Sequence, residues 1–285
     1  MSCYAVPKSE LKFFAHSFWS NYSPAWRLYN QCILMDRETM PAAYQVFADN
    51  LQQPHFAATL GHPEEPAMAG DLHVVCRQKI VNKCAFFEFL RSLPVNWNSQ
   101  FLFAQIYAAQ YPLLEEFFVK EKGGKALRDD ISMHYVAPEE PALTSDPDLP
   151  PGFSLDSLSV NDAEFVNSVW KFGGDRGLKK LKFWIKYMPS ICIRNPSGQS
   201  VAHCLSTTSG SLGSLWVDPP CRRRGWASLM MQRLTESVRA LNLGTPVYCQ
   251  VEVTNPASKA FMERIGWTNH DCDVMFGRYT PGPTT

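Results

Sequence analysis

The stretch from Leu212 to Leu234, LGSLWVDPPCRRRGWASLMMQRL, joins a predicted strand to a predicted helix through three consecutive arginines. The first turn of a helix exposes backbone N–H groups that have no intrahelical partner, and the helix dipole adds positive potential there. A phosphate approaches these groups only where the residues are small, and Gly225 and Ala227 satisfy that condition. The spacing predicts a phosphate cradle between the strand and the helix. The alternative interpretation is a solvated, charged turn.

The composition around this stretch is typical of a globular protein with two domains of ordinary size. The chain has 285 residues, of which 45% are hydrophobic, and no apolar run reaches the roughly 20 residues of a membrane span. Its nine cysteines are scattered without a C-x-x-C motif, and no two histidines stand four residues apart. We therefore expect no metal, no disulfide framework and a reducing, cytoplasmic location. The first residues also lack the features of a secretory signal or a transit peptide.

The clearest boundary is APEEPALTSDPDLPP, residues 137–151, which holds five prolines and four acidic residues and no aromatic residue. This composition is typical of a semi-rigid linker. It predicts an N-terminal domain over 1–136 and a C-terminal domain over 152–285. The part before Gly152 has 12 basic and 17 acidic residues, and the rest has 15 and 10. A basic second half is compatible with an anionic ligand.

Both halves alternate between helical and strand-like patterns, which predicts an α/β (α+β) fold. In the first half, the segments at 28–35, 72–78, 101–108 and 130–137 are predicted to be strands. The second half is predicted to have the order β-α-α-β-β-β-α-β-α-β-β. Its long helix after Gly225 has an apolar stripe for packing on a sheet, formed by Met230, Leu234, Val238 and Leu241.

Two motifs of the second half resemble the GNAT superfamily of acyl-CoA N-acyltransferases. VDPPCRRRGWA is similar to its pyrophosphate loop, (R/Q)-x-x-G-x-(G/A), and EVTNPASKAFMERIGW is similar to its strand, asparagine, short helix and Gly-aromatic hallmark. FVNSVWKFGG, MPSICIRNPSGQSVAHC and TPVYCQVEVTN resemble the glycine N-acyltransferase family more narrowly. The resemblance is specific over 153–267 and weaker in the N-terminal half, at LPVNWNSQFLF. It implies tandem GNAT-like domains, each a mixed, mostly antiparallel twisted sheet flanked by helices.

The resemblance also implies where acyl-CoA, as co-substrate, is held. The backbone amides from Arg223 to Ala227 take the pyrophosphate, and Val217 hydrogen-bonds the pantetheine arm between two splayed strands. The Leu215 amide faces the thioester carbonyl as an oxyanion donor. Trp226 either stacks near the cofactor or caps the hydrophobic core. The complete predicted CoA-binding set is Leu215, Val217, Arg222, Arg223, Arg224, Gly225, Trp226, Ala227, Asn255 and Ser258.

The implied reaction is attack of an amine on the thioester, which requires a base to remove a proton from the amine. The base of glycine N-acyltransferases falls on Ser211 in this spacing, and the tyrosine acid of the superfamily falls on Met262. Serine is no general base at neutral pH, although it can hold a water. Glu252 shares a strand face with Gln250 and is the best remaining carboxylate, with an exposed strand charge as the alternative interpretation. The predicted catalytic residues are Glu252, Ser211 and Leu215.

The predicted acceptor is a small amine or an amino acid such as glycine, covered by the loop WKFGGDRG at 170–177, whose glycines alternatively only form a turn. We expect no nucleic-acid or membrane partner, because the basic residues form no stripe beyond 222–224. Two alternatives remain open, a non-catalytic acyl-CoA sensor or scaffold and a peptide N-acetyltransferase. The family resemblance adds a mitochondrial location as an alternative to a cytoplasmic one.

Overall fold

The computed structural model describes residues 3–18, 23–77, 81–129, 131–140 and 148–283, and the chain divides into two compact units. Unit 1 contains Met1–His134, Glu252–Asn255 and Asp271–Thr285, and unit 2 contains Tyr135–Val251 and Pro256–His270. The predicted linker begins just after the passage from unit 1 to unit 2 at residue 134, and its residues 141–147 lie outside the described residues.

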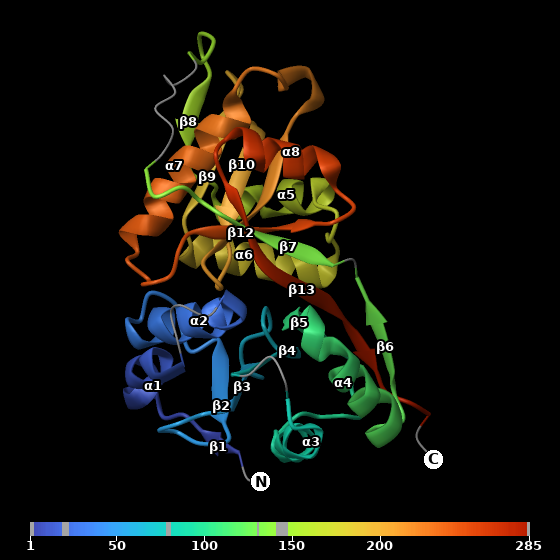
Figure 1. Ribbon diagram of the computed structural model, residues 1–285. Coiled ribbons are helices and arrows are strands. Elements are labelled where there is room, and N and C mark those ends of the chain that lie inside the picture. Colours follow the sequence, from blue (N-terminus) through green and yellow to red (C-terminus); the bar gives the residue numbers. More distant parts are fainter. Residues whose placement is uncertain (1–2, 19–22, 78–80, 130, 141–147, 284–285) are drawn as a thin grey trace. The chain divides into compact units, whose positions relative to one another are not determined.

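The elements of unit 1 follow the chain from the N-terminus (Figure 1). They are β1 (Tyr4–Ala5), η1 (Lys8–Glu10), α1 (Leu11–Phe18), η2 (Ser23–Ala25), α2 (Trp26–Asp36), β2 (Tyr44–Ala48), β3 (Phe56–Gly61), β4 (Asp71–Cys76), α3 (Lys83–Ser92), β5 (Phe101–Tyr107), η3 (Ala108–Gln110), α4 (Tyr111–Glu116), η4 (Phe117–Glu121) and β6 (Lys125–Arg128). The next strand, β7 (Ser132–Val136), spans the passage into unit 2.

The elements of unit 2 follow in the same way, and the last strand returns to unit 1. They are β8 (Ser154–Asp156), η5 (Val160–Asp162), α5 (Ala163–Val169), α6 (Asp175–Tyr187), β9 (Ser190–Arg194), β10 (Ser200–Ser206), β11 (Ser211–Val217), η6 (Pro219–Cys221), α7 (Trp226–Ala240), β12 (Tyr248–Glu252), α8 (Pro256–Arg264) and β13 (Thr268–Thr280).

The two units repeat one order of elements. Unit 1 has β1-α1-α2-β2-β3-β4-α3-β5-α4, and unit 2 has β8-α5-α6-β9-β10-β11-α7-β12-α8. In unit 1 the strand order is β1-β2-β3-β4-β5-β13, with β6 on β13, and in unit 2 it is β12-β11-β10-β9-β8. The ladders of both sheets are antiparallel, except β4 with β5 and β11 with β12. The predicted tandem of mixed, mostly antiparallel sheets flanked by helices is confirmed.

Helices cover both faces of the unit 2 sheet. The Cys204 thiol lies 3.8 Å from the Met231 sulfur of α7, whereas the ring of the adjacent His203 meets Phe165 of α5, with ring centroids 6.1 Å apart. Because successive side chains of a strand point to opposite faces, α7 and α5 lie on opposite faces of the sheet. The predicted apolar stripe of α7 is buried at Met230, Leu234 and Val238, and Leu241 follows as the C-cap.

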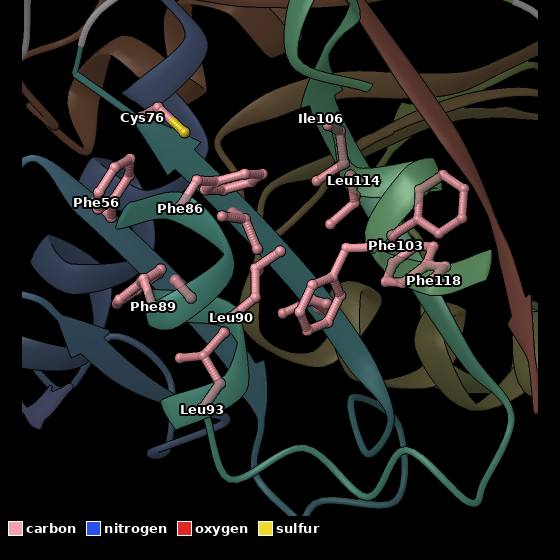
Figure 2. Close-up of a cluster of buried hydrophobic side chains, with 14 of the residues drawn as sticks. Phe56, Cys76, Phe86, Phe89, Leu90, Leu93, Phe103, Ile106, Leu114 and Phe118 are labelled. Carbon is pink, nitrogen blue, oxygen red and sulfur yellow. The ribbon is translucent and has the colours of Figure 1, made fainter. Parts of the chain in front are cut away.

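The core of unit 1 is rich in phenylalanine (Figure 2). Side chains from β4, α3, β5 and α4 meet in one buried cluster, which includes Phe86, Phe89, Phe103 and Leu114. Aromatic pairs such as Phe56 and Phe89, with ring centroids 5.6 Å apart, add to the free energy of apolar burial. Within the described residues, no helix is long and apolar enough to cross a membrane.

Two sequence-based expectations differ from the structure. The segment 28–35, predicted as a strand, belongs to α2, in which every residue from Trp26 to Met35 is buried. An element buried on all sides loses the periodic pattern that distinguishes a helix from a strand. Two closing strands were predicted in the C-terminal domain, but the structure has one strand there, β13. From Asp271 onward it belongs to unit 1 and pairs antiparallel with β5, with Val274 opposite Tyr107. The division at 137–151 therefore remains a proposal.

Candidate functional site

The strands β11 and β12 separate shortly after they begin. They pair in parallel at only two positions, Ser211 with Tyr248 and Leu212 with Cys249, although β11 continues to Val217. The residues from Gly213 to Val217 are each partly exposed, whereas Ser211 and Leu212 are buried. Backbone groups along this half of β11 therefore have no neighbouring strand on the β12 side. This is the splayed arrangement that the resemblance implied for the pantetheine arm.

A β-bulge interrupts β11 in its exposed half. His203 of β10 pairs with Trp216 of β11, and Leu205 of β10 pairs with Gly213 of β11. The two pairs are thus two residues apart on β10 but three residues apart on β11. The extra residue lies at Ser214–Leu215, and Ser214 has a left-handed φ of 52°. A bulge leaves one residue out of the ladder and redirects its backbone groups. The Leu215 amide, predicted as the oxyanion donor, lies at this irregularity.

The loop after β11 leads into α7 through two left-handed residues. Arg223 has φ 63°, and Gly225, the N-cap of α7, has φ 78° and no side chain to cap the helix. The Leu229 N–H donates to the carbonyl of the N-cap Gly225 at 3.1 Å. The amides of residues 226–228 therefore precede the intrahelical ladder. Left-handed residues beside a helix start form a concave set of N–H groups that suits an anion. The loop has two such left-handed residues, and phosphate binding there stays a prediction.

The three arginines differ in their surroundings. All are exposed. The Arg222 Nε donates to the Val217 carbonyl at 3.0 Å and so fixes the loop to the end of β11. The Arg224 guanidinium stands 5.6 Å from the Trp226 ring centroid. Within the described residues, none of the three arginines forms a salt bridge with a carboxylate.

The side chain of Trp226 lies in the hydrophobic core. It is 1% exposed and packs on Phe153, with ring centroids 5.5 Å apart. Of the two interpretations of its side chain, burial supports the hydrophobic cap, since a ring this deeply buried offers no surface to a ligand. Its backbone N–H remains part of the cradle.

Ser211 lies in a ring of three hydroxyls. Its Oγ is 2.9 Å from the Thr207 Oγ1 and 2.8 Å from the Ser209 Oγ, and these two are 2.7 Å from each other. Ser211 is 2% exposed. The Tyr248 hydroxyl donates to the Ser209 carbonyl at 3.0 Å. This closed network, missed by the sequence reasoning, is signalled by the hydroxyl-rich run STTSGS at 206–211.

The remaining predicted residues are divided between the units. Ser258, on α8, belongs to unit 2, whereas Glu252 and Asn255 belong to unit 1 and are partly exposed. The Asn255 N–H donates to the Glu252 carbonyl at 2.9 Å in a tight turn. The structure thus gathers Ser211, Leu215, Val217 and the cradle in one unit and leaves the placement of Glu252 and Asn255 beside them as a prediction.

Two side chains near the proposed chemistry are structural. Met262, at the position of the superfamily's tyrosine acid, is 5% exposed and its sulfur lies 3.8 Å from the Cys249 sulfur. His203 is 1% exposed and stacks on Trp216 with centroids 5.5 Å apart. Burial lowers the pKa of His203 to about 4, so the ring is neutral near pH 7.

The predicted acceptor loop is a tight turn that requires its glycines. A Cβ on Gly173 would stand 2.2 Å from the Asn167 carbonyl oxygen. Gly174 has φ 130°, and its N–H donates to the Asn167 Oδ1 at 3.1 Å. Phe172 at the tip is 48% exposed. The turn accounts for both glycines, and contact with an acceptor stays a prediction.

No group of three or more His, Cys, Asp or Glu side chains in the described part of the chain could hold a metal ion. The candidate site thus consists of the splayed pair of β11 and β12, the bulge in β11, and the candidate anion cradle in the loop between β11 and α7.

Comparisons with known proteins agree with this geometry. Residues 190–267 match the model of the acetyltransferase (GNAT) family. The mouse glycine N-acyltransferase-like protein Keg1 is 34% identical over 105 residues, 36% of this chain and 35% of that protein. The rat glycine N-acyltransferase is 27% identical over 236 residues, 71% of this chain and 74% of that protein. The chain thus spans about a third of the first relative and about three quarters of the second.

Solved structures support the fold of the whole chain. A crystal structure of a Drosophila protein superposes with a TM-score of 0.80 at 18% identity, covering 99% of both chains. A tandem GNAT protein from the clavulanic acid biosynthesis pathway superposes with a TM-score of 0.55 at 12% identity, covering 100% of this chain and 99% of that one.

Proposed function

Because residues 190–267 match the GNAT acetyltransferase family in a chain that resembles the glycine N-acyltransferases, we propose that this protein is an acyl-CoA-dependent N-acyltransferase. It moves an acyl group from a CoA thioester to the amine of a small molecule or amino acid, by direct attack in a ternary complex. The observation that carries the proposal is the cradle from Arg222 to Ala227, which follows a strand whose outer half has no partner on the β12 side.

The cradle accounts for binding of the diphosphate group. Gly225 and Arg223 turn the backbone so that N–H groups converge at the start of α7. The exposed Arg222, Arg223 and Arg224 add positive charge, and guanidinium groups suit phosphate oxygens. The open half of β11, from Gly213 to Val217, offers backbone groups to the amide-bearing pantetheine arm as an added strand would.

The bulge accounts for activation of the thioester. When bound, the CoA thioester supplies the electrophilic acyl carbon. In this proposal the Leu215 N–H, which lies at the bulge, donates to the carbonyl oxygen as negative charge develops there. A fixed donor of this kind is worth about 10²–10³-fold in turnover.

Proton removal from the amine is assigned to Glu252. Ser211 is buried, and its hydroxyl already bonds Thr207 and Ser209, so we assign it the support of the turn before β11 in place of the predicted catalytic role. Met262 has no acidic proton. With methionine at the position of the superfamily's acid, the departing CoA thiolate takes its proton from solvent. Because an amine is mostly protonated near pH 7, the rate should rise with pH as the unprotonated fraction grows.

The test is acyl transfer by the purified full chain, measured as thiol release and as acylated amine by mass spectrometry, with a panel of amines and acyl-CoA thioesters. Glu252→Gln should lower kcat by about 10²–10⁴-fold and leave CoA affinity unchanged. Ser211→Ala is the matched control, because it should lower stability and leave kcat within a few fold. A Glu252→Gln enzyme with normal turnover would remove the base assignment. Tight CoA binding without transfer to any amine would indicate a non-catalytic acyl-CoA binder.

A further inference from the structure

Unit 1 repeats the element order of the proposed acyl-CoA site, and the equivalent cleft can be compared feature by feature. Its strands β4 and β5 pair in parallel at Asp71 with Leu102 and Leu72 with Phe103, and then separate, as β11 and β12 do. The strand–helix crossover through α3 also corresponds to the one through α7. If this order of elements were sufficient to bind CoA, unit 1 would hold a second CoA site.

The strand that would face CoA lacks the bulge. From Phe56 with Cys76 to Leu60 with Leu72, β3 and β4 pair residue by residue without a shift. Every residue of β4 from Asp71 to Cys76 is buried, whereas Gly213–Val217 of β11 are partly exposed. The strand in unit 1 therefore offers neither a displaced amide for a thioester carbonyl nor an accessible surface for a pantetheine arm.

The helix start that would receive the diphosphate is already capped. Asn82, with φ −67° and ψ 110°, is the N-cap of α3, and its side chain accepts from the Ala85 N–H at 3.1 Å. This bond satisfies one of the N–H groups that an anion would use. The corresponding position in unit 2 is Gly225, which has no side chain and a left-handed φ of 78°.

A side chain bridges the open end of the unit 1 cleft. Gln110, in η3 just beyond β5, donates from its Nε2 to the carbonyl of Cys76, the last residue of β4, at 3.4 Å. Both residues are 1% exposed. Cys76 belongs to the same buried cluster as Phe86, Phe103, Ile106 and Leu114 (Figure 2). The end of β4 that would border the cleft therefore lies in the apolar core of unit 1.

We infer that each chain binds one acyl-CoA, in unit 2, and that the equivalent cleft of unit 1 is closed to CoA by Asn82, Gln110 and the unbroken β3–β4 pairing. This inference rests on the proposed function, because it assumes that CoA binds at the cradle of unit 2.

The experiment is the stoichiometry of CoA binding to the full chain, by titration calorimetry and native mass spectrometry. We expect one CoA per wild-type chain, and a CoA affinity about 10²-fold lower in a folded Gly225→Glu variant. Cys84→Glu is the matched change, because it places a carboxylate at an exposed position in the first turn of α3, where an acidic side chain is favourable for folding. It should leave the stoichiometry at one and the affinity within about twofold.

Two CoA molecules per wild-type chain, a CoA bound by Gly225→Glu with wild-type affinity, or a CoA affinity that falls tenfold or more in Cys84→Glu would each overturn the inference. No binding at all to the wild-type chain would overturn the proposed function as well, and so the two failures are distinguishable. If the Gly225→Glu variant does not fold, amide hydrogen exchange on the wild-type chain can locate the CoA site instead. We expect CoA to slow amide exchange in β11 and residues 222–228, and equal slowing in β4 and residues 82–86 would refute the inference.

Discussion

Replacement of Gly225 is the sharpest perturbation of the cradle, and it separates two effects. Gly225 has φ 78° and ψ −3°, a left-handed conformation that costs an L-residue roughly 1–2 kcal/mol. Gly225→Ala should therefore lower the free energy of unfolding by about that amount, measured by urea titration. Because Gly225 is exposed, the added methyl group meets solvent and no core packing is lost.

Gly225→Glu adds a carboxylate beside the proposed diphosphate site. At a separation of about 5 Å and an effective dielectric of about 20, two like unit charges repel by about 3 kcal/mol. Since 1.4 kcal/mol is a factor of ten, CoA affinity should fall by about 10²-fold relative to Gly225→Ala, measured by titration calorimetry at low salt. Similar unfolding curves for the two variants would confirm that charge causes the difference. Equal CoA affinity in Gly225→Glu and the wild type would refute the cradle.

Three further predictions concern turnover, pH and domain boundaries. Leu215→Pro removes the N–H at the bulge, a position where proline is tolerated. It should lower kcat by about 10²–10³-fold and leave CoA affinity unchanged, and normal turnover would contradict the oxyanion assignment. Burial lowers the pKa of His203 to about 4, so the unfolded chain binds a proton before the folded chain does as the pH falls. The free energy of unfolding should therefore decrease between about pH 6.5 and pH 4, and His203 should account for about 3 kcal/mol of that decrease. His203→Phe should flatten that decline in denaturant titrations, and an unchanged pH profile would count against it. Limited proteolysis should cut first within 137–151, and first cleavage inside 153–267 would place the boundary elsewhere.

The order of elements in the second half as far as α8, and the glycine turn before α7, were predictable from the sequence because both depend on local rules. The three arginines and the glycine that follows them lie within a few residues of each other, between a strand and an amphipathic helix, so the motif is recognisable without any distant residue. The stripe of Met230, Leu234 and Val238 is likewise local, and it is buried as expected.

Features that depend on distant residues were not predictable. The bulge at Ser214–Leu215 becomes visible only when β10 is laid beside β11. The ring of Thr207, Ser209 and Ser211 depends on the shape of a turn, and it changes the interpretation of Ser211 from a candidate water-binding residue to a buried structural one. The return of β13 to β5 pairs residues more than 160 positions apart along the chain. The helix α2 lacks an exposed face, and periodicity therefore failed there.

The central claim is that the cradle of unit 2 serves acyl transfer from CoA to an amine. The most direct measurement is formation of acylated amine by the full chain, followed by mass spectrometry across acyl-CoA thioesters and small amines, glycine included. We expect amine-dependent release of one CoA thiol per acylated product in the wild type. At an acyl-CoA concentration near the wild-type Kd, we expect loss of most of both signals in a folded Gly225→Glu variant. Product formation that is unchanged in that variant, or no acylated product from any pair of substrates, would contradict the account.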